Sequence, residues 1–554
     1  MNTHENPLAE GIIREGLIKL DSLSFNTKFW EKDASLWKQD KESQDFIVQF
    51  LGWQKVYDWT LERLEEVTSF AKEVKENFNH CVIMGMGGSS LAPEVFRTVF
   101  GKQEGYPELI VLDTTNPDWV DAARAQLDPA KTLFIFASKS GGTVEPSSQF
   151  AYFFDEVKKA GVKHPGQNFA AITDEGTGLA ALAKQHKFRH TFINPSDIGG
   201  RFSALSFFGI VPAAIMGVDV HKLLTLAQEQ AAAFGPQAPV KDNAALKLGA
   251  FMGACCANHG RDKLTLLTPK DLVTFGLWAE QLVAESTGKE GKGIVPVAGE
   301  ALLPNFDYRE DRFFVHLSTG SEDDKRILAL ANKLGDHEAP LLTIELASAY
   351  ELGALFLLWE IATAAAGAIL AINPFDQPNV QEAKTMTKEV LGKLANGNIP
   401  AAISAPILVS KDIADTVKLD TLAQDVYSLL ESNDYVALLP YVYPSKETEE
   451  AFAALRDKIM LRTKRAVLFG YGPRYLHSTG QLHKGDGNNG VFIIFSADAN
   501  HDIQIPGQKY TFGQLCNAQA LGDFQALESK GRRVIKLHLT QPLAEQIRKI
   551  SDLF

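Results

Sequence analysis

The feature that most constrains the fold is a repeated pattern of a short apolar run, a Gly- or Ser-rich turn and a helical segment. It occurs four times between residues 81 and 185, in CVIMGMGGSSLAPEVFRTVF, LIVLDTTNPDWVDAARAQL, TLFIFASKSGGTVEPSSQFAYFF and FAAITDEGTGLAALAKQ. Strands that alternate with helices at this spacing form βαβ units, which build a parallel sheet covered by helices on both faces. The sequence therefore predicts a doubly wound α/β domain over residues 76–240.

A second series of apolar segments predicts another sheet further along the chain. These segments are KLTLLT, RFFVHLS, PLLTIEL, RAVLFGY, GVFIIFS and RVIKLHL, with helical patterns between them. We therefore expect an α/β protein with two doubly wound parallel-sheet domains, the second covering residues 241–554. A polar, helical stretch around 385–464 is predicted to be an insertion that interrupts the second sheet. Residues 1–75 are predicted to be a helical segment that packs on both domains.

Composition narrows the function classes. With 554 residues the chain is long enough for more than one core, and 45% hydrophobic with 22% charged residues is typical of a soluble globular protein. The net charge of −13 argues against non-specific binding to nucleic acid or to anionic membranes. The stretch 354–372 is long and apolar enough to raise the question of a membrane span, but it contains Glu360 and many small residues. We expect a buried helix, no membrane association and a cytoplasmic protein.

No motif for a cofactor or a metal is evident. GMGGSSLAP lacks the third glycine of a dinucleotide fingerprint, because Ser90 takes its place, and it lacks the ending of a Walker loop. His477 and His483 are six residues apart with no further ligand in view. The four cysteines, which show no metal-ligand spacing, are expected to be reduced thiols: Cys81, Cys255, Cys256 and Cys516.

Two loops rich in hydrogen-bond donors follow predicted strands, at the edge where parallel sheets bind ligands. In SKSGGT the hydroxyls belong to Ser138, Ser140 and Thr143, and the two glycines let the backbone approach a ligand closely. GMGGSS offers the same chemistry through Gly88 and Ser89. Both loops suit a phosphate monoester. The alternative for each is an ordinary turn whose hydroxyls cap the next helix.

Four further side chains could act on a bound ligand. In DIGGRFS a guanidinium at a flexible turn could stabilise an oxyanion, and in WAEQLVAESTGK a carboxylate near a helix end could act as a base. A lysine follows INPFDQPNVQEA, and YLHSTGQ holds a histidine in a Ser/Gly-rich loop. Each also has a plainer interpretation as a solvated or structural residue. The four residues are Arg201, Glu285, Lys384 and His477.

Together these motifs resemble those of the phosphoglucose isomerase family, whose members contain two sugar-isomerase (SIS) domains. The similar segments are GMGGSSLAP, SKSGGT, GGRFS, ESTGK and NPFDQPNVQEAK. The resemblance runs in order from about residue 45 to about 385 and continues over 465–540. It implies reversible interconversion of glucose 6-phosphate and fructose 6-phosphate, a step of glycolysis and gluconeogenesis, with no cofactor and no metal.

The resemblance also implies a role for each matching residue. Glu285 would move the proton between C1 and C2, Arg201 would stabilise the enediolate, and His477 would open the sugar ring with help from Lys384. Gln281 would contact the substrate, one helical turn before Glu285. The sugar phosphate would be held by Gly88, Ser89, Ser138, Lys139, Ser140 and Thr143.

One departure concerns chain order. In ordinary members of the family the ring-opening histidine lies between the glutamate and the lysine, whereas His477 follows both. This order resembles the isomerase half of bifunctional transaldolase/phosphoglucose isomerase proteins, without the transaldolase part. The family also suggests a homodimer. The alternatives are a non-catalytic phosphosugar-binding regulator of the same fold, and an isomerase that accepts mannose 6-phosphate as well.

Overall fold

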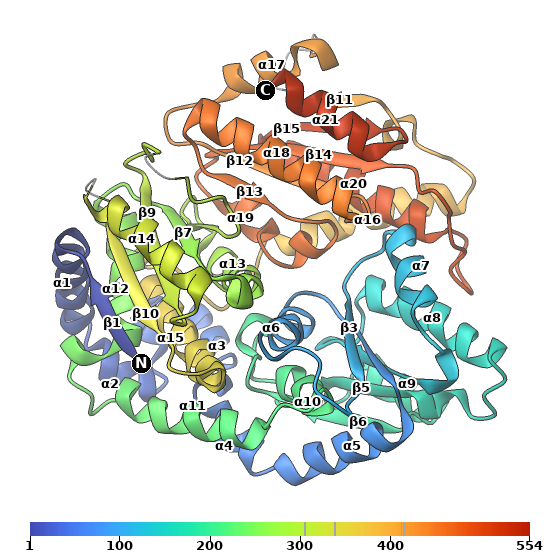
Figure 1. Ribbon diagram of the computed structural model, residues 1–554, viewed down its shortest axis with the longest axis horizontal. Helices are drawn as coiled ribbons and strands as arrows, with labels where there is room; N and C mark the ends of the chain where they lie inside the picture. Colours follow the sequence, from blue (N-terminus) through green and yellow to red (C-terminus); the bar gives the residue numbers. More distant parts are fainter. Residues whose placement is uncertain (304–305, 337–338, 412, 414–416) are drawn as a thin grey trace.

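The computed structural model contains three five-stranded sheets, each covered by helices (Figure 1). The structure describes residues 1–303, 306–336, 339–411, 413 and 417–554. The α/β class and the predominance of parallel strands are confirmed. The expected number of sheets is wrong, since the segments assigned to one second sheet divide between two.

The first sheet is fully parallel and has the order β3-β2-β4-β5-β6. Four of its strands coincide with the apolar runs of the repeated pattern. All six residues of β4 are buried, as expected of a central strand with helices on both faces. The strands are β2 (His80–Met84), β3 (Glu108–Leu112), β4 (Thr132–Ala137), β5 (Phe169–Asp174) and β6 (His190–Asn194).

The second sheet has the order β1-β10-β9-β7-β8. Its parallel strands are β7 (Lys263–Leu267), β8 (Val295–Val297), β9 (Arg312–Ser318) and β10 (Leu341–Glu345). The edge strand β1 (Asn2–Glu5) pairs with β10 in the antiparallel direction. The predicted N-terminal segment 1–75 is helical from α1 onward, but β1 at its start was not expected. The sequence NTHE has no apolar residue, so backbone hydrogen bonds to β10 define this strand rather than a hydrophobic pattern.

The third sheet has the order β11-β15-β14-β12-β13. Its strands are β11 (Ile407–Val409), β12 (Tyr435–Tyr441), β13 (Val467–Phe469), β14 (Gly490–Ala497) and β15 (Arg533–Leu539). The predicted helical insertion at 385–464 is thus wrong, because it contains β11 and the inner strand β12. Pro440, which usually marks a strand edge, obscures β12 in the sequence, but it is the last residue but one of the strand.

Helices before, between and after the strands cover the three sheets. Those up to the end of the first sheet are α1 (Pro7–Ser22), α2 (Phe25–Trp30), α3 (Lys41–Val48), α4 (Val56–Leu61), α5 (Leu64–Asn77), α6 (Leu91–Phe100), α7 (Pro117–Ala125), α8 (Val144–Lys159) and α9 (Gly178–His186). Those between the first and third sheets are α10 (Phe207–Ile215), α11 (Val220–Phe234), α12 (Ala244–Asn258), α13 (Val273–Thr287), α14 (Glu322–Asp336), α15 (Leu352–Leu370) and α16 (Val380–Ala395). The third sheet carries α17 (Leu422–Leu429), α18 (Lys446–Thr463), α19 (Gly480–Gly485), α20 (Phe512–Ser529) and α21 (Leu543–Leu553). Short 3₁₀ turns at the site are η3 (Gly87–Ser89), η6 (Gly200–Phe202) and η12 (Arg474–His477).

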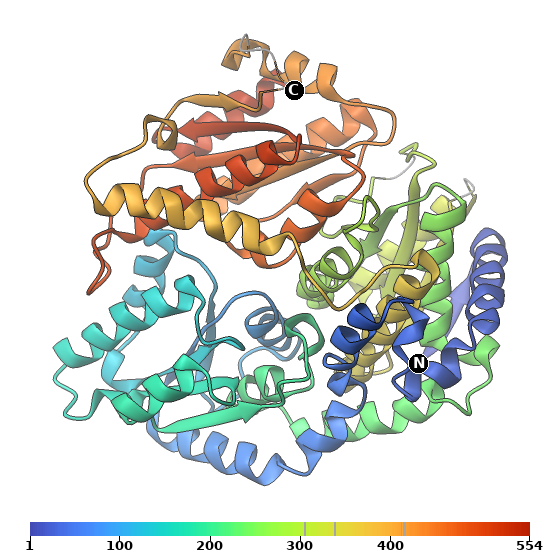
Figure 2. The same cartoon turned by 180° about the vertical axis from the view of Figure 1, so that it is seen from behind.

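The first sheet lies between two hydrophobic cores. Side chains of successive strand residues point to opposite faces. In β2, Cys81 and Ile83 belong to a core shared with the second sheet, whereas Val82 and Met84 belong to a core shared with the third. The three sheets are therefore packed into one body. We call each sheet, with the helices that cover it, a lobe, and we number the lobes as their sheets. Helix α16 lies along the third lobe, beside α20 (Figure 2).

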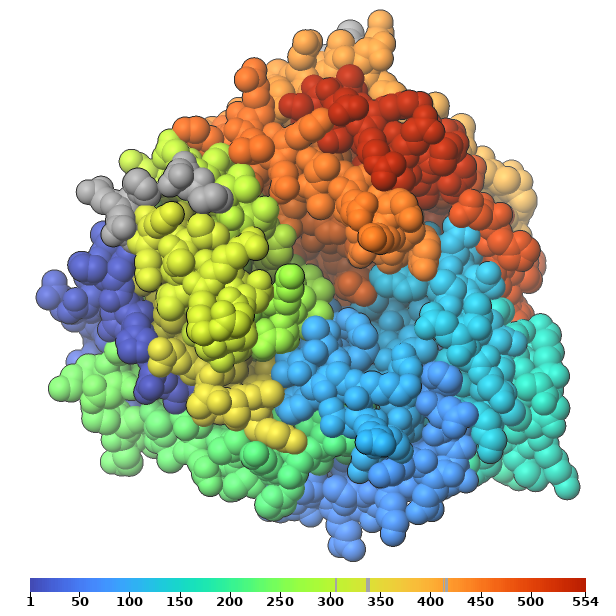
Figure 3. All heavy atoms as spheres, in the orientation of Figure 1, coloured from blue at the N-terminus to red at the C-terminus, as the bar shows by residue number. Residues whose placement is uncertain are grey.

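The apolar stretch identified in the sequence forms α15, at the centre of the second lobe. Among the described residues α15 is the helix long and apolar enough to cross a membrane, and its most apolar window is completely buried inside the protein. The prediction of a buried helix is confirmed. The space-filling view shows the three lobes meeting near the middle of the molecule (Figure 3).

Candidate active site

The glycine-rich turns that follow β2 and β6 pack directly against each other. A Cβ atom on Gly88 would lie 1.9 Å from the carbonyl oxygen of Gly200, so no larger residue fits there. Gly87 has a φ of 54°, and a Cβ on it would lie 2.7 Å from Nε2 of Gln281. Ser89, which is half-buried, ends the first of these turns. Two motifs of the first sheet thus meet beside the helix that carries Gln281.

The SKSGGT loop folds into a compact turn in front of α8. The hydroxyl oxygens of Ser138 and Thr143 are 3.1 Å apart, and the backbone N–H of Gly141 donates to Ser138 Oγ at 3.1 Å. The N–H of Gly142 donates to Ser140 Oγ at 3.4 Å. The hydroxyls therefore gather at the N-terminus of a 16-residue helix, where the helix dipole favours an anion.

Lys139 is directed away from these hydroxyls. Its Nζ forms an ion pair with Asp174 and donates to the carbonyl oxygen of Ser196 at 2.7 Å. Burial raises the pKa of Asp174, and the nearby Lys139 opposes this increase. The ammonium group already has two partners, so a contact between Lys139 and a phosphate stays a prediction.

Glu285 lies between an amide and a guanidinium near the end of α13. Gln281, one turn earlier as its spacing predicts, donates from Nε2 to Oε2 of Glu285 at 3.0 Å. Nη1 of Arg201 lies 3.2 Å from the other carboxylate oxygen. Arg201 is 2% exposed and Glu285 is 8% exposed. A base and a cation are thus held side by side away from bulk water, where electrostatic interactions are strong.

The guanidinium of Arg201 is fixed by the chain that follows α15. Its Nη2 donates to the carbonyl oxygens of Pro374 at 2.6 Å and Asp376 at 3.0 Å. Its Nη1 donates to Oε1 of Gln377 at 2.9 Å, and its Nε donates to Oγ of Ser286 at 2.7 Å. The GGRFS and NPFDQPN motifs, far apart in the sequence, therefore meet at this side chain.

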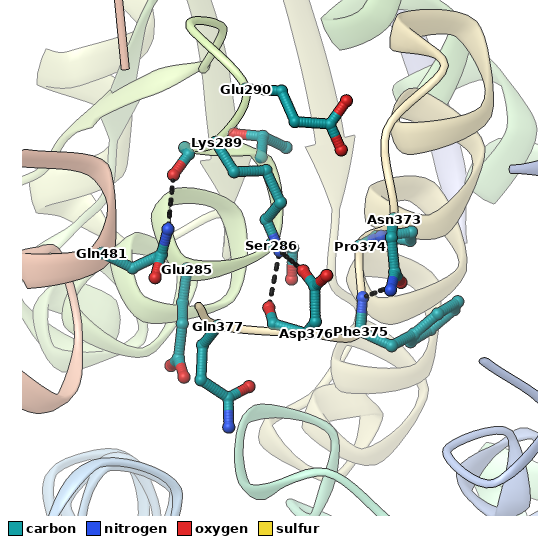
Figure 4. Close-up of polar contacts among 12 residues, drawn as sticks. Glu285, Ser286, Lys289, Glu290, Asn373, Pro374, Phe375, Asp376, Gln377 and Gln481 are labelled. Carbon is teal, nitrogen blue, oxygen red and sulfur yellow. Dashed lines mark hydrogen bonds and ion pairs between the residues drawn. The ribbon is translucent and has the colours of Figure 1, made fainter. Parts of the chain in front are cut away.

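A second buried cation contacts the same segment. Lys289 Nζ donates to the carbonyl oxygen of Asp376 at 2.5 Å and to its Oδ1 at 2.7 Å (Figure 4). Burial, followed by the charge of Arg201, lowers the pKa of Lys289 to about 8. Figure 4 also shows Glu285 and Gln377 extending toward the same side of this segment. The ESTGK motif thus supplies both the carboxylate and a lysine that holds the neighbouring loop.

Gln481, in the YLHSTGQ segment of the third lobe, connects two of these motifs. Its Nε2 donates to the carbonyl oxygen of Gly288 at 2.9 Å and to Oδ1 of Asn379 at 2.8 Å. Its Oε1 accepts from the backbone N–H of Asn379 at 2.9 Å. The side chain is fully buried, so the third lobe is firmly attached to ESTGK and NPFDQPN.

His477 pairs with a carboxylate of the first lobe. Its Nε2 lies 3.0 Å from Oε1 of Glu145, which also accepts from Nε2 of Gln519 at 2.7 Å. Burial alone would raise the pKa of Glu145, but its pKa is lowered overall by the charge and hydrogen bond of His477, its own backbone N–H and the charge of Lys384. The carbonyl oxygen of His477 accepts from Gln281 at 2.8 Å. The histidine is therefore joined to the helix of Glu285.

A cavity of about 530 Å³ opens beside His477. Its wall includes Ser140 and Thr143 of the SKSGGT loop, together with Lys384, which is exposed on the first turns of α16. Arg201 and Glu285 do not line this cavity and lie behind Gln281 and the backbone of His477. The structure thus brings all four predicted reacting side chains to one region of the molecule, in two adjoining groups.

Several residues of the site were not predicted from the sequence. Glu145 and Gln519 contact each other although 374 residues separate them in the chain. Glu145 lies in the first turn of α8, two residues after Thr143 of the SKSGGT loop, and this position is its local signal in the sequence. Gln377 and Gln481 lie within motifs used for the resemblance, but no spacing rule assigns them a partner. Among the residues that the structure describes, no group of three or more His, Cys, Asp or Glu side chains is arranged to hold a metal ion.

Comparison with solved structures shows which known proteins share this fold. The fold matches a hypothetical protein of Thermus thermophilus with a TM-score of 0.60 and 23% identity, covering 70% of this chain and 99% of the other. It also matches a glucose-6-phosphate isomerase of Chlamydia trachomatis with a TM-score of 0.52 and 20% identity, covering 66% of this chain and 78% of the other. The chain shares its α/β fold with these two proteins.

The predicted resemblance to the phosphoglucose isomerase family is confirmed. The model of that family matches residues 55–295. A probable glucose-6-phosphate isomerase of Methanococcus maripaludis is 27% identical over 425 residues, which cover 70% of this chain and 93% of the relative. A glucose-6-phosphate isomerase of Carboxydothermus hydrogenoformans is 27% identical over 435 residues, covering 69% and 92%. The matched family region includes both Arg201 and Glu285.

Proposed function

We propose that this protein is an aldose–ketose isomerase that interconverts glucose 6-phosphate and fructose 6-phosphate. The observation that carries this proposal is the buried group in which Glu285 contacts both Gln281 and Arg201, next to the His477–Glu145 pair. The family match and the names of the curated relatives support the same reaction. The isomerisation needs a base, a cation and a proton relay, and side chains of this site offer all three.

Glu285 is the proposed base for the transfer between C1 and C2. It takes the C2 proton of the open-chain aldose and returns it to C1, so that one carboxylate serves both carbons. Negative charge then develops on the oxygens of the enediolate, and the guanidinium of Arg201 stabilises it. Because five hydrogen bonds and ion pairs hold Arg201 in place, little reorganisation is needed when this charge forms.

His477 is proposed to open the sugar ring. Its Nε2 faces Glu145, which orients the imidazole. Lys384 lines the same cavity and contributes a positive charge near the ring oxygen. This assignment holds although His477 follows Glu285 and Lys384 in the chain, because folding brings the third lobe back to the first.

The SKSGGT loop is the proposed phosphate site. Ser138, Ser140 and Thr143 supply hydroxyl donors at the N-terminus of α8, and the resemblance adds Gly88 and Ser89 of the turn after β2. Lys139 adds to this site when its ammonium exchanges Asp174 for the phosphate. The substrate is a small sugar phosphate, and we further propose a cytoplasmic location. Use of mannose 6-phosphate, a homodimer and a link to transaldolase fusions stay predictions.

Glu285→Gln tests the proposal, with Glu290→Gln as the matched control. Glu290 lies five residues further on, and its carboxylate contacts Lys38 at the surface rather than Arg201. We expect Glu285→Gln to reduce kcat by about a hundredfold or more while calorimetry shows that the sugar phosphate still binds. The Glu290 variant should turn over like the wild type. Unchanged turnover in Glu285→Gln would refute the assigned base.

A further inference from the structure

A chain of buried hydrogen bonds continues behind His477 and crosses between two lobes. Glu145 Oε1 accepts from Nε2 of Gln519 at 2.7 Å, and Oε1 of Gln519 accepts from the hydroxyl of Thr115 at 2.5 Å. Thr115 follows β3 of the first sheet, whereas Gln519 lies in α20 of the third lobe. All three residues are at most 3% exposed, so these contacts are shielded from bulk water.

The direction of each hydrogen bond follows from the chemistry of the end members. An ionised carboxylate only accepts hydrogen bonds, so the amide nitrogen of Gln519 must face Glu145. The amide oxygen then faces Thr115, whose hydroxyl must donate to it. Thr115 thereby fixes the orientation of the Gln519 amide, which would otherwise be free to present its oxygen to Glu145.

Two donors therefore converge on one oxygen of Glu145, from Gln519 and from His477. The charged and titratable groups near Glu145 are His477 of η12, Lys384 of α16 and Tyr441 of β12. Gln519, unlike these three groups, has no charge that changes with pH. Its hydrogen bond therefore stabilises the ionised carboxylate of Glu145 whatever the state of His477. An ionised Glu145 keeps a proton on Nε2 of His477 and leaves Nδ1 as the ring nitrogen that can exchange a proton with a ligand. Nδ1 has no hydrogen-bond partner in the part of the chain that the structure describes.

We propose that Gln519, oriented by Thr115, is a positioning residue for ring opening. It holds Glu145 in its ionised form and thereby sets the tautomer and the orientation of His477. This inference rests on the proposed isomerase function and adds to it a residue of the third lobe, outside the matched family region of 55–295.

The test compares Gln519→Met with Gln525→Met on the same helix. Gln525 is half-buried, and its side chain makes no hydrogen bond to the described residues of the site. Methionine keeps the length of glutamine but cannot donate to Glu145. We expect kcat/KM for glucose 6-phosphate to fall about tenfold in Gln519→Met and to stay at the wild-type value in Gln525→Met. Thr115→Val, which removes only the orienting hydroxyl, should give a smaller loss in the same direction.

A kinetic isotope effect separates positioning from general damage. With substrate deuterated at C2, slower ring opening makes C–H cleavage less rate-limiting, so the isotope effect on kcat/KM should fall toward one in Gln519→Met. The acid limb of the pH profile should also move to higher pH, because loss of a donor raises the pKa of Glu145. A reduced rate with an undiminished isotope effect would overturn the inference, and so would wild-type kinetics.

The same experiment distinguishes two kinds of failure. If the wild-type protein converts the sugar phosphate but Gln519→Met behaves identically, only the role of Gln519 is refuted. If the wild-type protein shows no turnover, the proposed function fails and the inference fails with it. Nitrogen NMR of the His477 ring gives a readout without turnover, since Gln519→Met should shift its tautomer signals and Gln525→Met should not.

Discussion

At the scale of single residues, two buried cations hold the loop after α15. Arg201 and Lys289 both donate to the carbonyl oxygen of Asp376, and Arg201 is also paired with Glu285. Breaking one buried contact of this kind leaves the other charge without its partner, which is costly. The position of the loop therefore depends on the charge of Lys289.

This dependence predicts a basic limb in the pH profile. The pKa of Lys289 is lowered to about 8, so its ammonium loses its proton as the pH rises through that value. The contact with Asp376 Oδ1 then loses its charge, and kcat/KM should decline above about pH 8. In Lys289→Met activity should be several-fold lower at neutral pH and should lack this limb. Persistence of the limb in the variant would assign it to another group.

The sequence predicted some residues of the site and not others for a physical reason. Glu285 and Arg201 lie in short motifs whose letters match those of a known family. Glu145 and Gln519 acquire their roles from contacts between distant segments, so no local pattern contains them. Lys139 was expected to face a phosphate, but the pairing partner Asp174 lies 35 residues away and could not be foreseen.

At the scale of elements, the apolar helix α15 contains one buried carboxyl group, that of Glu360. Glu360 is fully buried, and no described residue hydrogen-bonds to either of its oxygens. Burial raises the pKa of this carboxyl group well above its ordinary value. In the folded protein Glu360 is therefore neutral at a pH where the unfolded chain would be ionised.

Replacing this side chain should stabilise the protein in a pH-dependent way. Above the ordinary pKa of a glutamate the folded state binds one proton more than the unfolded chain, so stability falls as the pH rises. We expect Glu360→Met to increase the free energy of unfolding by about 1–3 kcal/mol near pH 8, and by less near pH 5. Urea titrations at the two pH values measure this. An equal change at both would contradict a buried neutral carboxyl.

The contact between η3 and η6 gives a second prediction at this scale. In Gly88→Ala the new methyl group would overlap the carbonyl oxygen of Gly200, so the two turns must separate. We expect kcat/KM to fall by about tenfold or more. The variant should still fold, with a lower melting temperature than the wild type. Gly11→Ala, on the exposed face of α1 with no atom near its Cβ position, is the control and should keep full activity. Coupled-assay kinetics and thermal unfolding of both variants decide the matter.

Elements differed in how well the sequence predicted them. The strands β2 to β5 are continuous apolar runs, each followed by a turn of polar or small residues, and all four were predicted. The strand β1 has no apolar residue, so the hydrophobic pattern gives no signal for it, whereas β12 is an apolar run that contains Pro440, a residue that disfavours an inner strand. Both strands form because a neighbouring strand offers a row of backbone partners.

At the scale of the whole molecule, each lobe contributes one part of the site. Arg201 and the SKSGGT loop come from the first sheet, Glu285 from α13 of the second, and His477 from η12 of the third. The number of sheets could not be predicted from the sequence, because the residues of a strand do not indicate which other strands it pairs with. The division between the second and third sheets depends on long-range pairing that only the structure shows.

The most direct test of the account is the conversion of fructose 6-phosphate to glucose 6-phosphate by the purified full-length protein. The assay contains a chelator and no nucleotide, couples the product to a dehydrogenase, and runs mannose 6-phosphate alongside. The account predicts turnover in the wild-type protein and in Glu290→Gln, and its loss in Glu285→Gln. Binding of the sugar phosphate without any turnover would contradict the account and would instead indicate a phosphosugar-binding regulator.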